Sequence, residues 1–312
     1  MKCLVLGGGG FIGSNLCHAL LALGDTVRVF ENKADTSNGI FGDRLEWHQG
    51  DFNDRAQVAN ALRGCNVVYH LVSTTLPKNS NDDPIYDVRS NVVGTLQMLD
   101  EATREGVSKV IFISSGGTVY GVPQEIPIPE THPTDPICSY GIGKLAIEKY
   151  LQLFHALHGL DYCILRLSNP FGEHQPVTGA QGAVAVFLHK ALRGEMIEIW
   201  GDGGVVRDYL HISNAVDALI KTRTYAGQQR IFNIGSGVGL SLNDVISSIE
   251  SLTGSTVRRK YLPTRAFDVP INVLDISRAA EVLEWRPALS FEDGLRRTWN
   301  WLQEGAEKMY ER

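Results

Sequence analysis

Short apolar runs separated by amphipathic segments recur along most of this chain. The first run, residues 2–6, is apolar enough for a buried strand, and behind it apolar side chains repeat at helical spacing at Ile12, Leu16, Leu20 and Leu23. Gly24 then stands where such a helix would end. The pattern predicts a strand, a tight turn and a helix as the first unit of the fold.

The same unit repeats downstream. Helices are predicted over about residues 55–62 and from residue 139 onwards, and further strands over residues 26–30, 45–52, 66–72, 109–113 and 162–165. Strands that alternate with helices at this rhythm predict an α/β fold with a doubly wound parallel sheet of the Rossmann type. Helices predicted over 242–252 and 291–302 belong to a smaller C-terminal α/β lobe.

The first turn of the chain is a run of glycines. Gly7, Gly10 and Gly13 have the spacing G-x-x-G-x-x-G between a strand and a helix, a variant of the dinucleotide fingerprint. Glycines here let the backbone approach a pyrophosphate, which meets the partial positive charge of the helix N-terminus. Glu31 ends the next strand 18 residues after Gly13, where an acidic residue meets the adenosine ribose. A glycine run can be merely structural, but together with Glu31 it predicts a dinucleotide site.

Composition excludes several classes of protein. No stretch reaches the roughly 18 apolar residues of a membrane span, and the chain enters a strand directly at residue 2, which leaves no room for a signal peptide. A net charge of −6 without any run of basic residues argues against a nucleic-acid partner. Five cysteines without a C-x-x-C pair are typical of the reducing cytoplasm, and they predict no metal site.

Tyr140 and Lys144 stand four residues apart near the start of a predicted helix, so their side chains leave the same face. The pair follows residues 123–136, whose five prolines exclude regular structure. Y-x-x-x-K is common by chance. Here it lies beyond a dinucleotide-binding half, where the active edge of the sheet is expected, and we interpret it as an acid/base pair.

Several motifs taken together resemble the extended short-chain dehydrogenase/reductases: the glycine turn, Asn91 in Asn-Val-Val-Gly-Thr, Ser114-Ser115 followed by Val119-Tyr120-Gly121, and Tyr140 with Lys144. The resemblance covers almost the whole chain. Within that superfamily the chain is most similar to the nucleotide-sugar epimerases of the UDP-glucose 4-epimerase type. This similarity implies NAD as cofactor, a nucleotide-sugar substrate and a homodimer. It also implies an NAD-binding domain over 1–170 and a substrate-binding lobe over 171–312, interleaved with the first.

The fingerprint and the resemblance together give the expected cofactor contacts: Gly7, Gly10, Phe11, Ile12, Gly13, Glu31, Asp51, Phe52, Leu71, Asn91, Ser114, Tyr140 and Lys144. Asp51 follows a strand, where it could reach an adenine amino group or could instead cap the next helix. Arg28 and Lys33, close to Glu31, leave open a site for the 2′-phosphate of NADP.

Segments of the second half resemble the substrate-contacting segments of the family. Arg207 and Arg265 are implied as clamps on the diphosphate, because a guanidinium donates two parallel hydrogen bonds to phosphate oxygens. Each arginine could instead form a structural ion pair, and Trp200 could be an ordinary core residue. The implied substrate contacts are Thr74, Thr118, Tyr140, Asn169, Trp200, Arg207, Arg265, Asp268 and Asn272.

In the family this resembles, the tyrosine takes the proton of the sugar O4 while C4 gives hydride to NAD⁺, and the 4-keto sugar then accepts hydride on its other face. A tyrosine pKa of about 10 is too high for a base at neutral pH, and we expect the charge of Lys144 to lower it by about three units. The positive nicotinamide ring and the helix N-terminus are expected to act in the same direction. The family carries Ser or Thr where this chain has Gly116. The missing hydroxyl is therefore expected from Thr118, with Ser115 or water as alternatives.

The predicted function is 4-epimerisation of a UDP-hexose or UDP-N-acetylhexosamine. Dehydratases and decarboxylases of the family carry an acidic residue just before Val-Tyr-Gly, and this chain does not. A reductase of nucleotide 4-keto sugars that uses NAD(P)H is the alternative, whereas a cofactor-sensing regulator would not need the Tyr140–Lys144 pair.

In the family a tyrosine seven residues after the second diphosphate arginine excludes 2-acetamido sugars. Asn272 stands there, which predicts room for an acetamido group unless Asn272 only caps a turn.

Overall fold

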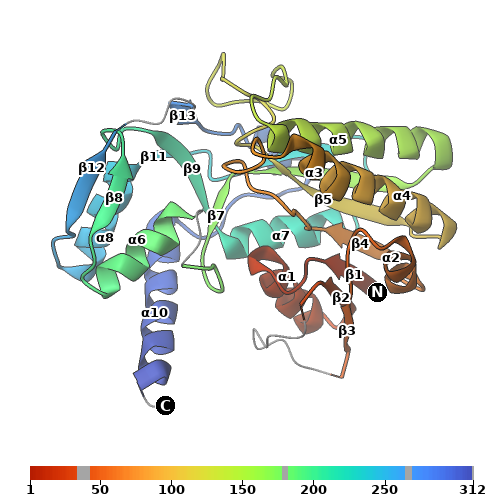
Figure 1. Cartoon of the computed structure of the whole chain (residues 1–312), viewed down its shortest axis with the longest axis horizontal. Helices are drawn as coiled ribbons and strands as arrows, with labels where there is room; N and C mark the ends of the chain where they lie inside the picture. Colours follow the sequence, from red (N-terminus) through yellow and green to blue (C-terminus); the bar gives the residue numbers. More distant parts are fainter. Residues whose placement is uncertain (34–42, 178–181, 264–268, 311–312) are drawn as a thin grey trace.

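The large sheet has seven strands, and every neighbouring pair is parallel. The computed structural model of the chain describes residues 1–33, 43–177, 182–263 and 269–310, and the sheet lies in the right half of Figure 1. The chain moves outward from β1 to β2 and β3 and then resumes at β4 on the other side of β1, which creates a switch point at the carboxyl edge. Across the sheet the order is β10 (Ile231–Ile234), β6 (Asp161–Leu167), β5 (Lys109–Ser115), β4 (Val67–His70), β1 (Lys2–Leu6), β2 (Thr26–Glu31) and β3 (Leu45–Gln49). The predicted doubly wound parallel sheet is confirmed.

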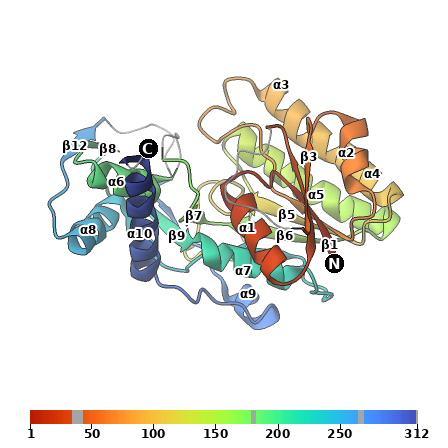
Figure 2. The same cartoon turned by 90° about the horizontal axis from the view of Figure 1, so that it is seen from below.

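Helices cover both faces of this sheet, because its strands carry apolar side chains on both sides (Figure 2). One face packs against α1 (Phe11–Ala22), α7 (Ile212–Thr222) and α9 (Ser277–Val282). The other face packs against α2 (Arg55–Leu62), α4 (Gly94–Arg104) and α5 (Ser139–His158).

Local chemistry fixes several of the helix ends. Gly24 follows α1 with φ +88° and Gly159 follows α5 with φ +70°, a left-handed conformation that a side chain would strain. Asp54 caps α2 by accepting hydrogen bonds from the N–H groups of Ala56 and Gln57. Gly24 and Gly159 thus fix where α1 and α5 end, and Asp54 fixes where α2 begins.

The segment before α4 is a nearly continuous helix of unusual geometry. It begins with α3 (Pro84–Asp87) and continues as the π-helix η1 (Val88–Val93) into α4. π-Helical turns are rare in proteins as a whole, but those that occur are often found at functional sites. The π-helix η1 lies against α5.

The smaller lobe lies in the left half of Figure 1. Its core lies among α6 (Ala183–Leu192), α8 (Leu242–Thr253), α10 (Phe291–Tyr310) and the parallel pair β8 (Ile197–Trp200) and β12 (Arg259–Leu262). A small sheet joins this lobe to the large one, with β9 (Val206–His211) pairing β7 (Asn169–Phe171), β11 (Gly239–Ser241) and β13 (Ile271–Asn272).

The two lobes are interleaved in sequence. β10, α7 and α9 all follow residue 170, yet they pack into the large sheet or onto its face. The segment 123–136 contains no helix, and its only β-structure is the isolated bridge between Ile128 and Leu274, as its prolines predict. Among the residues that the structure describes, no helix combines the length and the apolar character needed to cross a membrane.

Candidate active site

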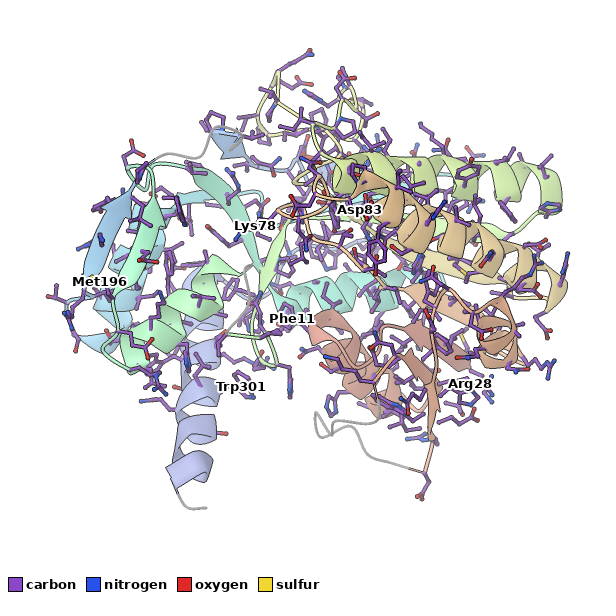
Figure 3. All side chains as sticks on the ribbon, viewed as in Figure 1. Phe11, Arg28, Lys78, Asp83, Met196 and Trp301 are labelled. Atoms are coloured by element: carbon purple, nitrogen blue, oxygen red, sulfur yellow. The ribbon has the colours of Figure 1, made fainter. Side chains whose placement is uncertain are left out.

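The glycine turn between β1 and α1 lies at the carboxyl edge of the sheet, beside the switch point. Gly7 has φ +81°, a conformation that favours glycine. A Cβ on Gly13 would lie 2.2 Å from the Gly7 carbonyl oxygen and 2.6 Å from Gly8 Cα, so α1 packs directly on the loop only because residue 13 has no side chain. Figure 3 places Phe11, the first residue of α1, near the junction of the two lobes. The turn therefore fits a pyrophosphate held at a helix N-terminus.

Glu31 ends β2 next to this turn, since a Cβ on Gly9 would lie 3.1 Å from Glu31 Cγ. Arg28, which could have favoured a 2′-phosphate, is only 8% exposed. Its guanidinium donates to Glu46 Oε2 at 2.7 Å and to the Ala61 carbonyl at 2.7 Å. Arg28 is thus held inside the protein, whereas Glu31 is half-buried and Lys33, two residues further on, is exposed. Lys33 is therefore the basic group of the two that stays accessible to a 2′-phosphate.

The remaining expected contacts to the adenosine half differ in exposure. Asp51 is exposed at the end of β3, and because Asp54 caps α2, the alternative in which Asp51 caps that helix is wrong. Phe52 is 6% exposed, with its ring 5.2 Å from that of His70 in the core. Leu71 is half-buried against the core on the other side of the sheet. The side chain of Asp51 is therefore accessible to a ligand, whereas the side chain of Phe52 packs into the core beneath the edge of the sheet.

Tyr140 and Lys144 lie on the first turns of α5 with their side chains adjacent, as predicted. Lys144 Nζ is 5.6 Å from the centroid of the Tyr140 ring and donates to the Ile113 carbonyl at 2.9 Å. Lys144 is only 6% exposed. Both side chains line a small cavity together with Val72, Ser73, Asp87, Asn91, Gly143 and Ile147.

The protonation of this pair differs from our expectation. Burial raises the pKa of Tyr140 to about 12; the neighbouring Cys138 and Asp87 act in the same direction, and a hydrogen bond with the Ser73 side chain acts against them. Burial also lowers the pKa of Lys144 to about 8. In the protein without its cofactor, burial is therefore the largest effect on the pKa of Tyr140, and the lowering that we expected from Lys144 does not dominate. Ionisation of Tyr140 near pH 7 needs a further positive charge, such as the nicotinamide ring of NAD⁺.

Residue 116 cannot carry the hydroxyl that the family places there. A Cβ on Gly116 would lie 2.5 Å from Leu274 Cδ1 and 3.2 Å from the carbonyl oxygen of Arg166, so the fully buried Leu274 fills that space. Ser115 is half-buried at the end of β5. Thr118 Oγ1 is buried and has no hydrogen-bond partner among the described residues. A hydroxyl for the chemistry must come from one of these two side chains or from water.

A buried polar network lies directly beneath the pair, and the sequence did not reveal it. Ser114 Oγ donates to Glu148 Oε1 at 2.6 Å, and Glu148 forms a two-pronged ion pair with Arg166, at 3.1 and 2.7 Å. Arg166 Nη1 also donates to the Tyr120 hydroxyl at 3.0 Å. These four side chains are at most 3% exposed. They fix α5 against β5 and β6, and since the Ser114 hydroxyl is used here, a cofactor would meet the Ser114 backbone.

Asn91 ties the loop after β4 to η1. Its Oδ1 accepts the N–H of Thr74 at 2.9 Å, while its Nδ2 donates to Asp87 Oδ1 at 2.9 Å and to Thr75 Oγ1 at 3.2 Å. Thr74 is exposed, and its hydroxyl lies 2.6 Å from Ser90 Oγ. Asp87 was missed in the sequence, although its position four residues before Asn91 was a signal that the two share a helix face.

The expected diphosphate and nucleoside contacts lie on the small sheet and the second lobe. Asn169 Nδ2 donates to the Asp208 carbonyl at 3.0 Å, and Arg207 Nη1 donates to the Val269 carbonyl at 2.7 Å. Trp200 is 42% exposed at the end of β8, so the alternative of a core tryptophan is wrong. Two further expected contacts, Arg265 and Asp268, lie outside the described residues.

Asn272 lies on β13, directly opposite Arg207 in the register with β9. It is 1% exposed, and its Nδ2 donates to the Gly116 carbonyl at 3.1 Å, so the alternative in which it only caps a turn is wrong. Its Oδ1 is buried without a hydrogen-bond partner in the described part of the chain. Asn272 thus links the small sheet to the segment that follows β5.

Comparisons with known proteins agree with this geometry. Residues 3–235 match the model of the NAD dependent epimerase/dehydratase family, and the chain belongs to this family. It is 35% identical to the UDP-glucose 4-epimerase of Mycolicibacterium smegmatis over 308 residues, which cover 96% of this chain and 97% of that protein. The UDP-glucose 4-epimerase of Thermotoga maritima, solved with UDP-glucose, has a TM-score of 0.93 at 34% identity, covering 98% of this chain and all of that one. The UDP-N-acetylglucosamine 4-epimerase of Methanobrevibacter ruminantium, solved with UDP-N-acetylmuramic acid, has a TM-score of 0.91 at 28% identity, covering 97% and 98%.

We expect the protein to bind NAD at least about tenfold more tightly than NADP, which corresponds to about 1.4 kcal/mol of binding free energy. The reason is the Glu31 carboxylate, which repels a 2′-phosphate, while Arg28 is engaged with Glu46. Calorimetric titration of cofactor-stripped protein with each dinucleotide measures the ratio, and Glu31→Gln should narrow it. Equal affinity for the two cofactors would contradict this assignment of Glu31.

Proposed function

We propose that this protein is an NAD-dependent 4-epimerase of UDP-sugars. The observation that carries the proposal is that Tyr140 and Lys144 share a cavity with Val72, and a Cβ on Gly7 of the glycine turn would lie 3.3 Å from the Val72 nitrogen. The fold around this cavity matches UDP-glucose 4-epimerases along nearly its whole length. Turnover of a panel of UDP-, TDP- and GDP-sugars, without added cofactor, tests it. Conversion of a UDP-sugar to its 4-epimer supports the proposal. Turnover only of 4-keto sugars, with consumption of NAD(P)H, would instead make the protein a reductase.

In this proposal Tyr140 exchanges the proton of the sugar O4. When bound, NAD⁺ would supply a reversible hydride acceptor for C4, so that the hydride lost in the first half of the reaction could return to the opposite face in the second. Tyr140 receives the O4 proton in the first half of the reaction and gives it back in the second, so protons balance as well. Lys144 stabilises the ionised tyrosine, and the Glu148–Arg166 pair beneath it keeps α5 in place.

The accessory hydroxyl is better placed on Ser115 than on Thr118, which our sequence analysis preferred. Ser115 is half-buried at the carboxyl end of β5. A Cβ on the neighbouring Gly117 would find the Ser115 Oγ at 3.9 Å and no nearer atom, so this side of the segment is open. Thr118 Oγ1 is enclosed by protein. We therefore propose Ser115, the hydroxyl on the open side of this segment, as the first candidate.

We expect Ser115→Ala to lower kcat by about a hundredfold, the typical cost of losing one hydrogen-bond donor to a reacting oxygen. Thr118→Val, which is nearly isosteric, should stay close to wild type. Steady-state kinetics on the same UDP-sugar compare the two variants. The opposite order would return the role to Thr118, and two near-normal variants would point to water.

The nucleotide is proposed to lie across the small sheet, with Arg207 and Arg265 on its diphosphate. The position of Arg207 supports this placement, because Arg207 is half-buried on β9 beside Asn272. Trp200 presents an exposed indole for the uracil, and Asn169 extends from the strand next to β9. Asp268 is proposed as a ribose contact from the resemblance alone.

Asn272 is proposed to admit 2-acetamido sugars. We first expected its amide to donate to the acetyl carbonyl, but its Nδ2 already donates to Gly116. Its Oδ1 has no partner in the described chain, and a buried acceptor of that kind is costly unless a donor meets it. The N–H of an acetamido group is such a donor. The relative from Methanobrevibacter ruminantium, a UDP-N-acetylglucosamine 4-epimerase with the same fold, supports the substrate class.

We propose that the enzyme is a homodimer through α3, η1 and α5. Large apolar side chains are exposed along these helices, including Tyr86 (52%), Val93 (41%), Ile142 (55%) and Leu157 (65%). Exposed apolar surface on packed helices favours a second copy of the same chain. Light scattering should give about twice the 34.3 kDa chain mass, and Leu157→Glu should reduce it. A wild-type monomer would contradict this interface.

We also propose that the protein works in the cytoplasm. All five cysteines are free thiols in the structure, and none is paired. Unpaired thiols are typical of a reducing compartment.

A further inference from the structure

Asp87 is a buried carboxylate at the wall of the catalytic cavity. It ends α3 just before the π-helix η1 and is 1% exposed. Figure 3 labels Lys78 and Asp83, which mark the segment between β4 and this residue. The carboxylate lines the same small cavity as Tyr140 and Lys144. Its hydrogen-bond partners in the described chain are hydroxyl and amide groups rather than an arginine, lysine or histidine, which is unusual for a buried carboxylate.

Three donors from three segments hold this carboxylate. Its Oδ1 accepts hydrogen bonds from Thr75 Oγ1, on the loop after β4, and from Asn91 Nδ2 at 2.9 Å, on η1. Its Oδ2 accepts from Ser139 Oγ at 2.6 Å, on the first turn of α5. Since Ser139 directly precedes Tyr140, Asp87 fixes the start of α5 relative to η1 and to the loop that carries Ser73.

The charge of Asp87 also acts on both members of the catalytic pair. It favours the protonated form of Lys144, against the burial that lowers the pKa of that amine to about 8. It also favours the protonated form of Tyr140, whose pKa burial raises to about 12. Neutralising a carboxylate in this place would therefore lower both pKa values, which no purely structural role would do.

Other titratable groups face the pair from neighbouring elements. Glu148, one turn further along α5, also favours protonated Lys144, but it is paired with Arg166. Cys138, just ahead of α5, favours protonated Tyr140. His70 on β4 stays neutral, because burial lowers its pKa to about 3. Asp87 is thus the carboxylate beside the pair that hydroxyl and amide groups of the described chain hold, rather than a cation.

We propose that Asp87 is a positioning residue of this enzyme, which holds the start of α5 against η1 and whose charge biases the proton exchange of the Tyr140–Lys144 pair until the positive nicotinamide ring is bound. The proposal rests on the roles given above to Tyr140 and Lys144. It implies that the tyrosine becomes a base only in the oxidised-cofactor complex, and that it stays a proton donor when the 4-keto sugar must be reduced.

The test compares the pH dependence of epimerase activity in the wild-type holoenzyme and in a variant that lacks the charge of Asp87. In Asp87→Asn, both limbs of the profile of kcat/KM should move to lower pH by about one unit, the effect of removing one nearby charge. The near-ultraviolet absorbance of ionised Tyr140, taken as the difference from Tyr140→Phe in the same background, should shift its midpoint the same way. This second readout needs no turnover.

Two matched variants separate charge from position. Ser139→Ala removes one hydrogen bond to Asp87 but leaves its charge, so it should lower kcat without moving either limb. Asp82→Asn removes an exposed carboxylate of the same segment and should change nothing. If Asp87→Asn fails to fold, Asp87→Ser replaces it as a smaller neutral variant.

The outcomes are distinguishable. Suppose that Tyr140→Phe is inactive, but Asp87→Asn changes neither the pH profile of kcat/KM nor the pH at which Tyr140 is half ionised. This result would overturn the role of Asp87 and leave the proposed function intact. Full activity of Tyr140→Phe would overturn the role of Tyr140, and with it this inference. A shift to lower pH in both readouts supports the proposal.

Discussion

Tyr140→Phe should keep its cofactor and lose epimerase turnover by about a hundredfold to ten-thousandfold, the range that a positioned acid/base group contributes. The substitution removes only the hydroxyl that exchanges the O4 proton. The ring still lines the cavity beside Lys144, whose Nζ lies 5.6 Å from its centroid. Steady-state kinetics with a UDP-sugar, and the absorbance of NAD released on denaturation, measure the two effects separately.

Tyr150→Phe is the matched control for this variant. Tyr150 lies on the same helix, packs at the edge of the core behind the pair and lines no part of the cavity. It should keep normal turnover. A Tyr140→Phe enzyme within tenfold of wild type would mean that another group takes the O4 proton.

Asn272→Tyr should remove activity on UDP-N-acetylhexosamines by at least about a hundredfold and spare UDP-glucose and UDP-galactose. A tyrosine ring beside Gly116 fills the space proposed for the acetamido group, and a steric clash rejects the larger sugar without touching the hydride chemistry. The values of kcat/KM for both sugar pairs, in wild type and variant, give the ratio.

Overpacking is the main risk at this site, because Asn272 is 1% exposed. Retention of NAD and an unchanged melting temperature must therefore accompany the kinetic result. Asn272→Leu, similar in size but without the amide, should weaken the acetamido substrates alone. Wild-type turnover restricted to UDP-galactose and UDP-glucose would contradict the role of Asn272.

Most of the fold could be predicted from the sequence because its signals are local. The apolar strands, the helical spacing after the glycine turn and the prolines of 123–136 each depend on neighbours in the chain. The bounds of α2 agreed with the prediction at both ends. β5 extends to Ser115, two residues beyond the prediction, because its register with β6 continues to the pair Ser115–Leu167. That pairing joins segments distant in sequence, and periodicity does not encode it.

The site was predictable as far as its motifs extend. Tyr140 and Lys144 share a helix face, so their proximity follows from spacing. Their protonation does not, because it depends on burial by Phe112 and on charges from other segments, among them Asp87. The choice between Thr118 and Ser115 likewise depends on how far each hydroxyl is buried, which the sequence does not show.

Contacts across the fold were the least predictable. Leu274 fills the space beside Gly116 from 158 residues further along the chain, and no local pattern links the two. Asn272 was placed at the sugar site by resemblance, yet which of its amide atoms is free depends on the carbonyl of Gly116. Such contacts follow only from the packing of the small sheet onto the end of β5.

The central claim is that hydride leaves C4 and returns to it within one active site. A UDP-sugar labelled with deuterium at C4, incubated with the purified protein and no added cofactor, tests this most directly. The proposed function predicts that in ordinary water the 4-epimer keeps its deuterium at C4, and that unlabelled substrate takes up none at that carbon from deuterium oxide. Loss of the label to solvent would mean that the carbon loses a proton rather than a hydride, and would contradict the proposed function.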